Sequence, residues 1–185
     1  FSEKIENAVV KNLKKQIPAN LEISSVSFQL FDDFPFSTVE INKLYIQEDK
    51  SFGEDTLLYA ETAYVRFSVI KFIFNEFSIE NISIYDGRVS IKENLKNSNY
   101  AFLNKNSNNE TAIELEKIEL VNTVINYISQ RNKIELALKC SNLKISIEEG
   151  GGYNVTGDYI SKKTRIYDKE YLENKKLKIN INYSN

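Results

Sequence analysis

The spacing of apolar positions divides the chain into a short helical part and a long part that alternates. In residues 3–17 apolar side chains recur at every fourth position, at Ile5, Val9, Leu13 and Ile17. This spacing predicts an amphipathic helix, with Ser2 at its N-cap and Pro18 ending it. We expect the helix to cover one end of a sheet; the alternative is a helix that lies on a membrane surface.

From about residue 21 onward, apolar and polar residues alternate, which is typical of β-strands with one buried face. The Asn-rich residues 94–111 predict a long polar loop, and Gly150–Gly152 predicts a turn between strands. We therefore expect one mainly β domain over residues 1–185, built as a curved antiparallel sheet with one N-terminal helix. The alternation leaves open whether this sheet stands alone or is one layer of a sandwich.

One spacing recurs among the expected strands: apolar-x-apolar-x-x-apolar-x-apolar. It occurs in LEISSVSF at Leu21, VEINKLYI at Val39, FSIENISI at Phe77, IELEKIEL at Ile113 and, with Cys140 counted as apolar, LKCSNLKI at Leu138. The two central polar residues shift the alternation by one, which in a regular strand would turn the later apolar side chains to the opposite face. A β-bulge would absorb the extra residue and increase the curvature, so the spacing predicts curved strands.

Composition narrows the function classes. The chain has no histidine and a single cysteine, Cys140, which excludes His-based triads, thiolate metal clusters and an intrachain disulfide. Cys140 alternates with Leu136 and Leu138, which predicts a buried thiol. The net charge of −2 has no basic cluster of the kind that nucleic-acid binding needs. No apolar run approaches the roughly 18–20 residues of a membrane-spanning helix.

Catalytic and metal-binding patterns are also lacking. Acidic pairs flank apolar runs, where charges mark strand ends, and no nucleotide-binding or nucleophile motif occurs. Residues 48–55 (EDKSFGED) resemble a calcium loop faintly, but Gly53 before Glu54 and Asp55 favours a turn. We expect a protein that is not an enzyme, with no catalytic residues, no metal and no cofactor.

Taken in order, the segments resemble the N-terminal region of the AsmA-like family, the bacterial envelope group that includes TamB. The family's opening hairpin, with a Phe-Pro near its turn, is similar to LEISSVSFQLFDDFPFSTVEINKLYIQED, where this dipeptide is Phe34-Pro35. A strand that enters a short apolar link, followed by another strand and a turn, is similar to LLYAETAYVRFSVIKFIFNEFSIENISIYDGRVSIKEN, with the turn at Asp86-Gly87. The segment that often comes next resembles residues 99–103, and a later strand that ends in Tyr resembles IELEKIELVNTVINYIS, here with Tyr127.

The resemblance covers residues 3 to 183 and has functional implications. It implies a sheet rolled into an open, taco-like groove, on the periplasmic side of the inner membrane. Such a groove would carry phospholipid between membranes or assist outer-membrane assembly. The family's transmembrane anchor is absent from these residues and its chains are longer, so we expect a fragment of a longer, anchored protein. The groove would be lined by Phe28, Leu30, Ile41, Val65, Phe67, Ile79 and Ile84; for each of them, a place in a closed core is the alternative.

The competing interpretation is a closed β-sandwich that acts as an adhesion or carbohydrate-binding module. It would expose a few aromatic side chains on one rim or face, with Tyr59, Tyr64 and Tyr153 as the candidates.

Overall fold

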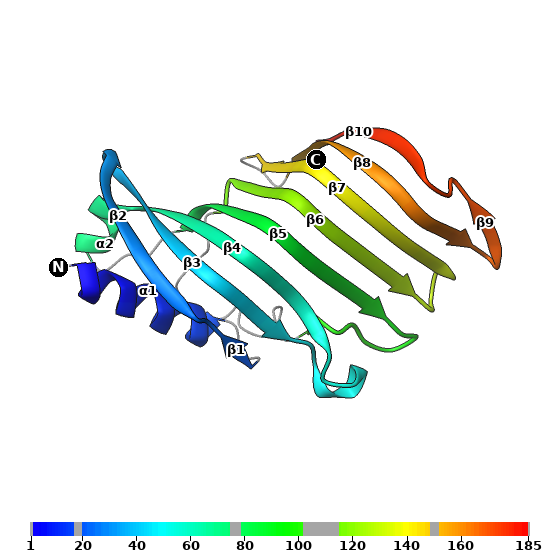
Figure 1. The fold of residues 1–185 in the computed structure, drawn as a ribbon, viewed down its shortest axis with the longest axis horizontal. Coiled ribbons are helices and arrows are strands. Elements are labelled where there is room, and N and C mark those ends of the chain that lie inside the picture. The colour runs from blue at the N-terminus through cyan, green and yellow to red at the C-terminus, as the bar shows by residue number, and fades with distance from the viewer. Residues whose placement is uncertain (1, 17–19, 75–78, 102–114, 149–151, 185) are drawn as a thin grey trace.

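The strands form one large open sheet (Figure 1). The structure is a computed structural model, and it describes residues 2–16, 20–74, 79–101, 115–148 and 152–184. Three helical segments are present in these ranges: α1 (Ser2–Gln16), the 3-10 helix η1 (Lys50–Phe52) and α2 (Val69–Ile73). The strands are β1 (Leu21–Glu22), β2 (Ser25–Asp33), β3 (Phe36–Gln47), β4 (Thr56–Ser68), β5 (Ile79–Glu93), β6 (Lys117–Ser129), β7 (Ile134–Ile147), β8 (Tyr153–Ile166), β9 (Lys169–Tyr171) and β10 (Lys175–Tyr183).

Neighbours in sequence are mostly neighbours in the sheet. β1 and β2 both pair with β3, and the order then runs β3-β4-β5-β6-β7-β8-β10, with the short β9 beside β8. All pairs are antiparallel except β5 and β6, which are parallel. β6 therefore begins at the same end of the sheet as β5. The expected mainly β, curved sheet with an N-terminal helix is confirmed.

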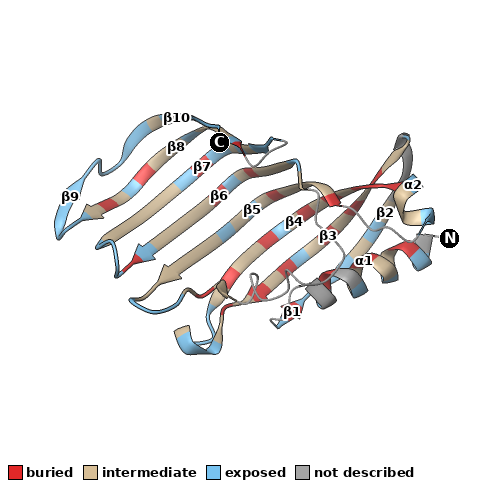
Figure 2. Ribbon diagram, turned by 180° about the vertical axis from the view of Figure 1, so that it is seen from behind, coloured by how far each residue is buried: buried red, intermediate tan, exposed pale blue. Residues whose placement is uncertain are grey.

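The inner face of the sheet, defined here as the face whose side chains pack with α1, holds the core. Buried side chains of α1, namely Ile5, Val9 and Leu13, belong to one cluster with buried side chains of β3, β4 and β5. Buried positions are concentrated in β3 and β4 beside α1 and become rare toward β10 (Figure 2). The helix thus covers one end of the sheet and leaves the other end uncovered by any described element.

A row of six exposed polar residues crosses the sheet at the level where the alternation shifts. The register places Ser24 beside Lys43, and then Glu61, Asp86, Asn122 and Ser141 in turn on β4 to β7. We call these six residues the polar row. Each strand from β3 to β7 carries its extra residue at this level, so the register between them continues through the row without a shift.

From the repeated spacing we expect a β-bulge to absorb the extra residue of each strand. Instead, most neighbouring strands carry their extra residues opposite one another in the polar row. The apolar face does stay continuous across it, because Ile41 before and Leu44 after the shift are both buried. A register shift at this level occurs only between β7 and β8, beside Ser141. Three members of the row, Lys43, Asp86 and Asn122, have left-handed backbones with φ near 50°, a conformation that bends a strand and increases its twist.

The expected turn at Asp86-Gly87 is wrong, because both residues lie inside the continuous strand β5. Gly87 permits a close approach there: a Cβ atom would lie 2.7 Å from Cγ2 of Ile84 and 2.8 Å from the carbonyl oxygen of Tyr59. Asp86 beside it takes the left-handed conformation and accepts a hydrogen bond from the amide of Asn122. Asp86-Gly87 is a dipeptide typical of turns, but here it forms a backbone irregularity within a strand.

The other predicted boundaries agree where the structure describes them. The predicted helix is found as α1, which includes Ser2 as its first residue and not as its N-cap; residues 17–19 lie outside the described residues. Residues 94–101 connect strands as expected, and the rest of the predicted loop to residue 111 lies outside the description. β7 and β8 flank the predicted glycine turn, of which only Gly152 is described.

Candidate functional site

Most of the predicted groove residues lie in the closed part of the inner face. Five of them are at most 6% exposed, in the cluster shared with α1: Ile41, Val65, Phe67, Ile79 and Ile84. Phe28 is partly buried, with its ring centroid 6.1 Å from that of Phe67. Leu30 lies in β2, but its side chain is outside the description. The structure brings six of the seven onto one face, where they form a core rather than an open surface.

The apolar character of this face continues far beyond the core. One unbroken row of directly paired residues runs across the strands: Phe28, Val39, Val65, Ile82, Ile118, Ile145, Val155 and Ile181. A second row runs beside it, interrupted only by a glycine: Val26, Ile41, Ala63, Ile84, Leu120, Leu143, Gly157 and Ile179. We call these the apolar rows. With strands roughly 4.8 Å apart, eight strands give each row a length of about 34 Å.

Exposure of the apolar rows increases from β3 toward β10. Val39 is 0% and Val65 3% exposed near α1, whereas Ile181 on β10 is 46% exposed. Between these limits, Ile145 and Val155 are half-buried. The part of the rows on β7, β8 and β10 is therefore an apolar surface that no described helix or strand covers.

Two side-chain contacts lie toward the two ends of these strands. At one end the rings of Tyr153 and Tyr183 stack, 5.0 Å apart. Toward the other end the hydroxyls of Ser161 and Thr164, both buried, lie 2.8 Å apart and satisfy each other. Buried hydroxyls on an otherwise apolar face need such partners.

Glu93, at the end of β5, forms a second polar cluster. Its carboxylate accepts hydrogen bonds from the hydroxyls of Tyr100, at 2.8 Å, and Tyr127, at 3.0 Å. The hydrogen bond from Tyr100 is the largest of the effects that lower the pKa of Glu93, while the same bond raises the pKa of Tyr100. The carboxylate is thus held in its ionised form, which suits a fixed acceptor and not a proton donor near neutral pH.

The stretch that resembled a calcium loop is used for a different purpose. The fully buried carboxylate of Glu48 accepts hydrogen bonds from Lys92 Nζ at 3.0 Å and Asn99 Nδ2 at 2.9 Å. Gly53, with φ 114°, ends η1 and forms the expected turn before Glu54. Among the described residues there is no group of three His, Cys, Asp or Glu side chains that could hold a metal ion.

Lys92 also contacts Asp55, at 3.5 Å. Burial by itself would lower the pKa of Lys92, but the carboxylates of Glu48 and Asp55 outweigh this effect and raise it. The pKa of Asp55 is lowered, first by a hydrogen bond from the backbone of Thr56 and then by Lys92. These residues join the β3–β4 connection to the end of β5 and support the fold.

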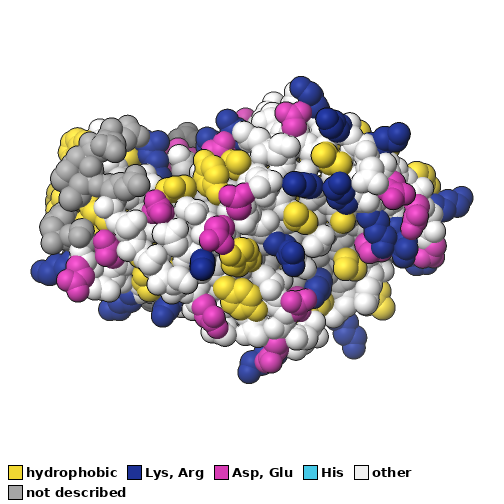
Figure 3. Space-filling model, in the orientation of Figure 1, with side chains coloured by type: hydrophobic (Ala, Val, Ile, Leu, Met, Phe, Trp, Pro, Cys, Tyr) yellow, Lys and Arg dark blue, Asp and Glu magenta, His cyan; other side chains and the backbone are white. Residues whose placement is uncertain are grey.

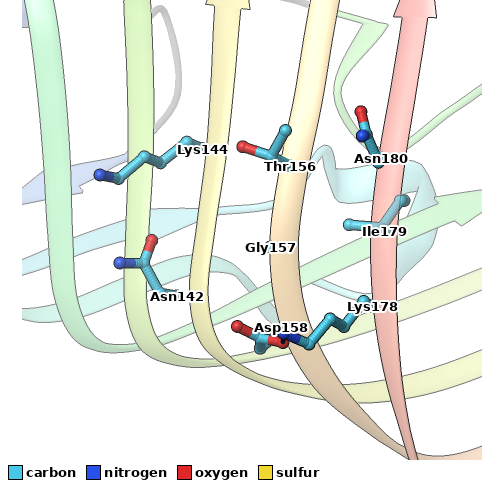
Figure 4. A pocket seen from close by; sticks show the side chains of 8 residues that line it. All are labelled: Asn142, Lys144, Thr156, Gly157, Asp158, Lys178, Ile179 and Asn180. Carbon is cyan, nitrogen blue, oxygen red and sulfur yellow. Dashed lines mark ion pairs between the residues drawn. The ribbon is translucent and has the colours of Figure 1, made fainter.

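The outer face of β7, β8 and β10 is polar and carries a shallow hollow. The hollow in Figure 4 has a volume of about 390 Å³ and is lined by side chains of β7, β8 and β10 such as Asn142, Lys144, Thr156 and Asn180. Lys178 and Asp158 form an ion pair of 3.7 Å at its edge. Both are highly exposed, and such a pair contributes little, so this hollow has the properties of an ordinary solvated surface.

The aromatic residues of the sandwich interpretation do not gather. Tyr64 is in edge-to-face contact with Tyr85 on the outer face, where Tyr59 also lies and donates a hydrogen bond to Glu61. Tyr153, by contrast, lies at the end of β8 against Tyr183. All described strands belong to a single sheet, so the described chain has no second layer of a sandwich.

Cys140 is a core residue as expected. It is 1% exposed on β7, and its burial raises the pKa of the thiol. A buried thiol with a raised pKa is a poor nucleophile.

Sequence reasoning missed the uncovered C-terminal residues, although a signal was present. Leu177, Ile179, Ile181 and Tyr183 alternate with polar residues on β10. This alternation marks a strand with one apolar face, but it does not say that the face stays uncovered.

Comparisons of the chain with family models, with curated proteins and with solved structures give no match. None of the described helices is long and apolar enough to cross a membrane.

Proposed function

We propose that the uncovered apolar rows on β7, β8 and β10 bind the acyl chains of a phospholipid or a similar lipid. The chain would then act as a non-catalytic lipid-handling domain, as its resemblance to AsmA-like envelope proteins implies. In that role it would be part of a path that transfers lipid between membranes, or of a scaffold for outer-membrane assembly.

The observation that carries this proposal is the continuity of the apolar rows. If the apolar side chains of this face served only to stabilise the fold, they would be confined to the strands that α1 covers. Beyond α1 the same face of the sheet would then carry polar residues. Here Ile145, Val155 and Ile181 extend the row beyond the covered part, in direct register with Val65. Large exposed apolar surfaces of soluble proteins mark binding sites.

The energetics of such binding need no specific contact. Covering apolar surface contributes about 25 cal/mol per Å², so every 100 Å² that an acyl chain covers contributes about 2.5 kcal/mol. Because the rows run across the strands, an acyl chain lying along their uncovered part meets apolar side chains of β7, β8 and β10 in succession. No catalytic residue is required for this mechanism.

Native mass spectrometry of the protein purified without detergent tests the proposal. We expect bound phospholipid, and binding of an apolar fluorescent dye that competes with it. Joint substitution Val155→Asp and Ile181→Asp places two charges on paired positions of one apolar row, and it should abolish both signals.

A matched control keeps the same strands and the same chemistry. Thr156→Asp and Asn180→Asp form the adjacent pair on the outer face, and they should leave both signals unchanged while circular dichroism shows that both proteins are folded. Absence of lipid and dye from the unmodified protein, or an equal loss in both variants, contradicts the proposal.

A further inference from the structure

The turns at one end of the C-terminal strands form a continuous surface. We call residues 128–133 and 162–176 the distal tip; they include the β6–β7 turn, the β8–β9 turn and the connection to β10. The backbone amide of Tyr167 donates to the carbonyl oxygen of Lys133 at 2.9 Å, and Lys133 Nζ lies 5.8 Å from the centre of the Tyr167 ring. Figure 1 shows these turns side by side around β9.

The distal tip is strongly basic within an acidic chain. It holds eight Lys and Arg residues and three Asp and Glu residues, a net charge of +5, whereas the whole chain has −2. Lys163 and Arg165 are paired with Glu135, but the exposed Lys169, Lys175 and Lys176 have no ion pair among the described residues. Lys and Arg side chains are also frequent over the adjoining strands (Figure 3).

Large apolar and aromatic side chains are exposed among these charges. Tyr167 is 65% exposed, Leu172 50% and Tyr171 47%. Tyr167 and Leu172 both have left-handed backbones, with φ 48°, at positions where Gly or Asn would be free of strain. Bulky residues that are held in a strained conformation and exposed to water point to a use other than stability.

From this combination we infer that the distal tip docks on the surface of an anionic lipid bilayer. Tyr side chains suit the boundary between water and acyl chains, because the ring is apolar and the hydroxyl is polar. The free lysines are attracted to anionic headgroups, and Leu172 enters the upper acyl region. This inference stands on the tip alone and does not depend on lipid binding by the apolar rows.

A soluble polyanion fits the tip less well. Lysines alone would be enough to bind a soluble polyanion. The exposed side chains of Leu172, Tyr167 and Tyr171, in contrast, gain free energy by leaving water. Turns of this kind, with apolar residues at the apex and lysines around them, match an interface that changes from charged to apolar over a few ångströms.

Sedimentation with vesicles tests the docking. The protein should bind vesicles of phosphatidylglycerol and phosphatidylcholine, and bind pure phosphatidylcholine much more weakly. Joint substitution Lys169→Glu, Lys175→Glu and Lys176→Glu should reduce the partition coefficient by more than about tenfold, because each lysine near an anionic surface contributes roughly fivefold. Raising the salt concentration should weaken binding of the unmodified protein.

The control variant has the same change in net charge elsewhere. Lys4→Glu, Lys11→Glu and Lys50→Glu replace three exposed lysines outside the tip, and the partition coefficient should fall far less. The inference is overturned if this control loses as much binding, if zwitterionic vesicles bind equally well, or if the unmodified protein does not bind at all.

A tryptophan reporter tests contact with the acyl region, because the chain has no tryptophan of its own. Emission of the Leu172→Trp variant should shift to shorter wavelength with anionic vesicles and not with heparin. Ser146→Trp, on an exposed site at the opposite end of β7, should show no shift. A shift at both sites, or heparin binding without vesicle binding, would exclude docking by the tip.

Lipid binding by the apolar rows and docking by the distal tip can be tested independently of each other. The Val155→Asp and Ile181→Asp variant should lose bound lipid and still bind anionic vesicles, whereas the lysine variant of the tip should do the reverse.

Discussion

At the scale of single residues, Asn99 connects parts of the chain that are far apart in sequence. It is fully buried, and its side-chain amide donates to Glu48 Oε2 at 2.9 Å and to the carbonyl oxygen of Ser90 at 2.8 Å. Its Oδ1 accepts from the backbone amide of Lys92 at 2.9 Å. All the polar atoms of this amide group therefore have partners, and Glu48 depends on it for one of its own.

Replacing Asn99 by Ala should lower the free energy of unfolding by about 2–4 kcal/mol, because the buried carboxylate of Glu48 and a backbone group lose their partners. Urea denaturation followed by circular dichroism measures this. Asn182→Ala, at an exposed site on β10, should change stability by less than about 0.5 kcal/mol. Equal effects of the two substitutions would show that the Asn99 contacts contribute nothing.

At the scale of elements, the polar row sets how neighbouring strands approach. The irregularities of β4 and β5 coincide at Glu61 and Asp86, and directly after them Gly87 lies against the backbone of Tyr59. Because both strands shift together, their pairing stays intact on either side. The result is a pair of strands that bend at the same level.

Gly87→Ala should therefore destabilise the protein by about 1–3 kcal/mol, since the added Cβ atom meets the Tyr59 carbonyl and Ile84 at less than 3 Å. Thermal unfolding compares it with Ser146→Ala, which places the same residue at an exposed position of β7 without adding a Cβ atom. If Gly87→Ala melts at the same temperature as Ser146→Ala, the approach of β4 and β5 is looser than described.

At the scale of the whole molecule, the inner face of the sheet is covered by α1 at one end and exposed at the other. β3 and β4 lie between other strands and carry the buried core, whereas β10 is an edge strand with mostly exposed side chains. Backbone hydrogen bonds at an exposed edge open more often than those in a covered centre. A difference in local stability along the sheet follows.

Hydrogen exchange should show this difference directly. We expect amides of β3 and β4 to exchange only through global unfolding, and amides of β10 to exchange much faster. Bound lipid should slow exchange in β7, β8 and β10 and leave β3 and β4 unchanged. Uniform protection across the sheet, with or without lipid, would contradict both the gradient and the place proposed for the lipid.

The sequence by itself determined the local features. A spacing of four residues specified α1, and a period of two specified the strands, because these patterns follow from the geometry of a single element. The repeated x-x interruption revealed irregular strands, and three of the five segments, at Leu21, Val39 and Leu138, place it on the polar row. Alternation around Cys140 was enough to predict its burial.

Only the tertiary structure decided which apolar residues are covered. Phe67 and Ile181 occupy equivalent positions in an alternating pattern, yet one is 0% and the other 46% exposed. The difference arises because α1 packs over one end of the sheet, and no spacing along a strand records where a distant helix will lie. The same holds for the Asp86-Gly87 pair: its residue types suit a turn, and only the pairing of β5 with β4 and β6 made it part of a strand.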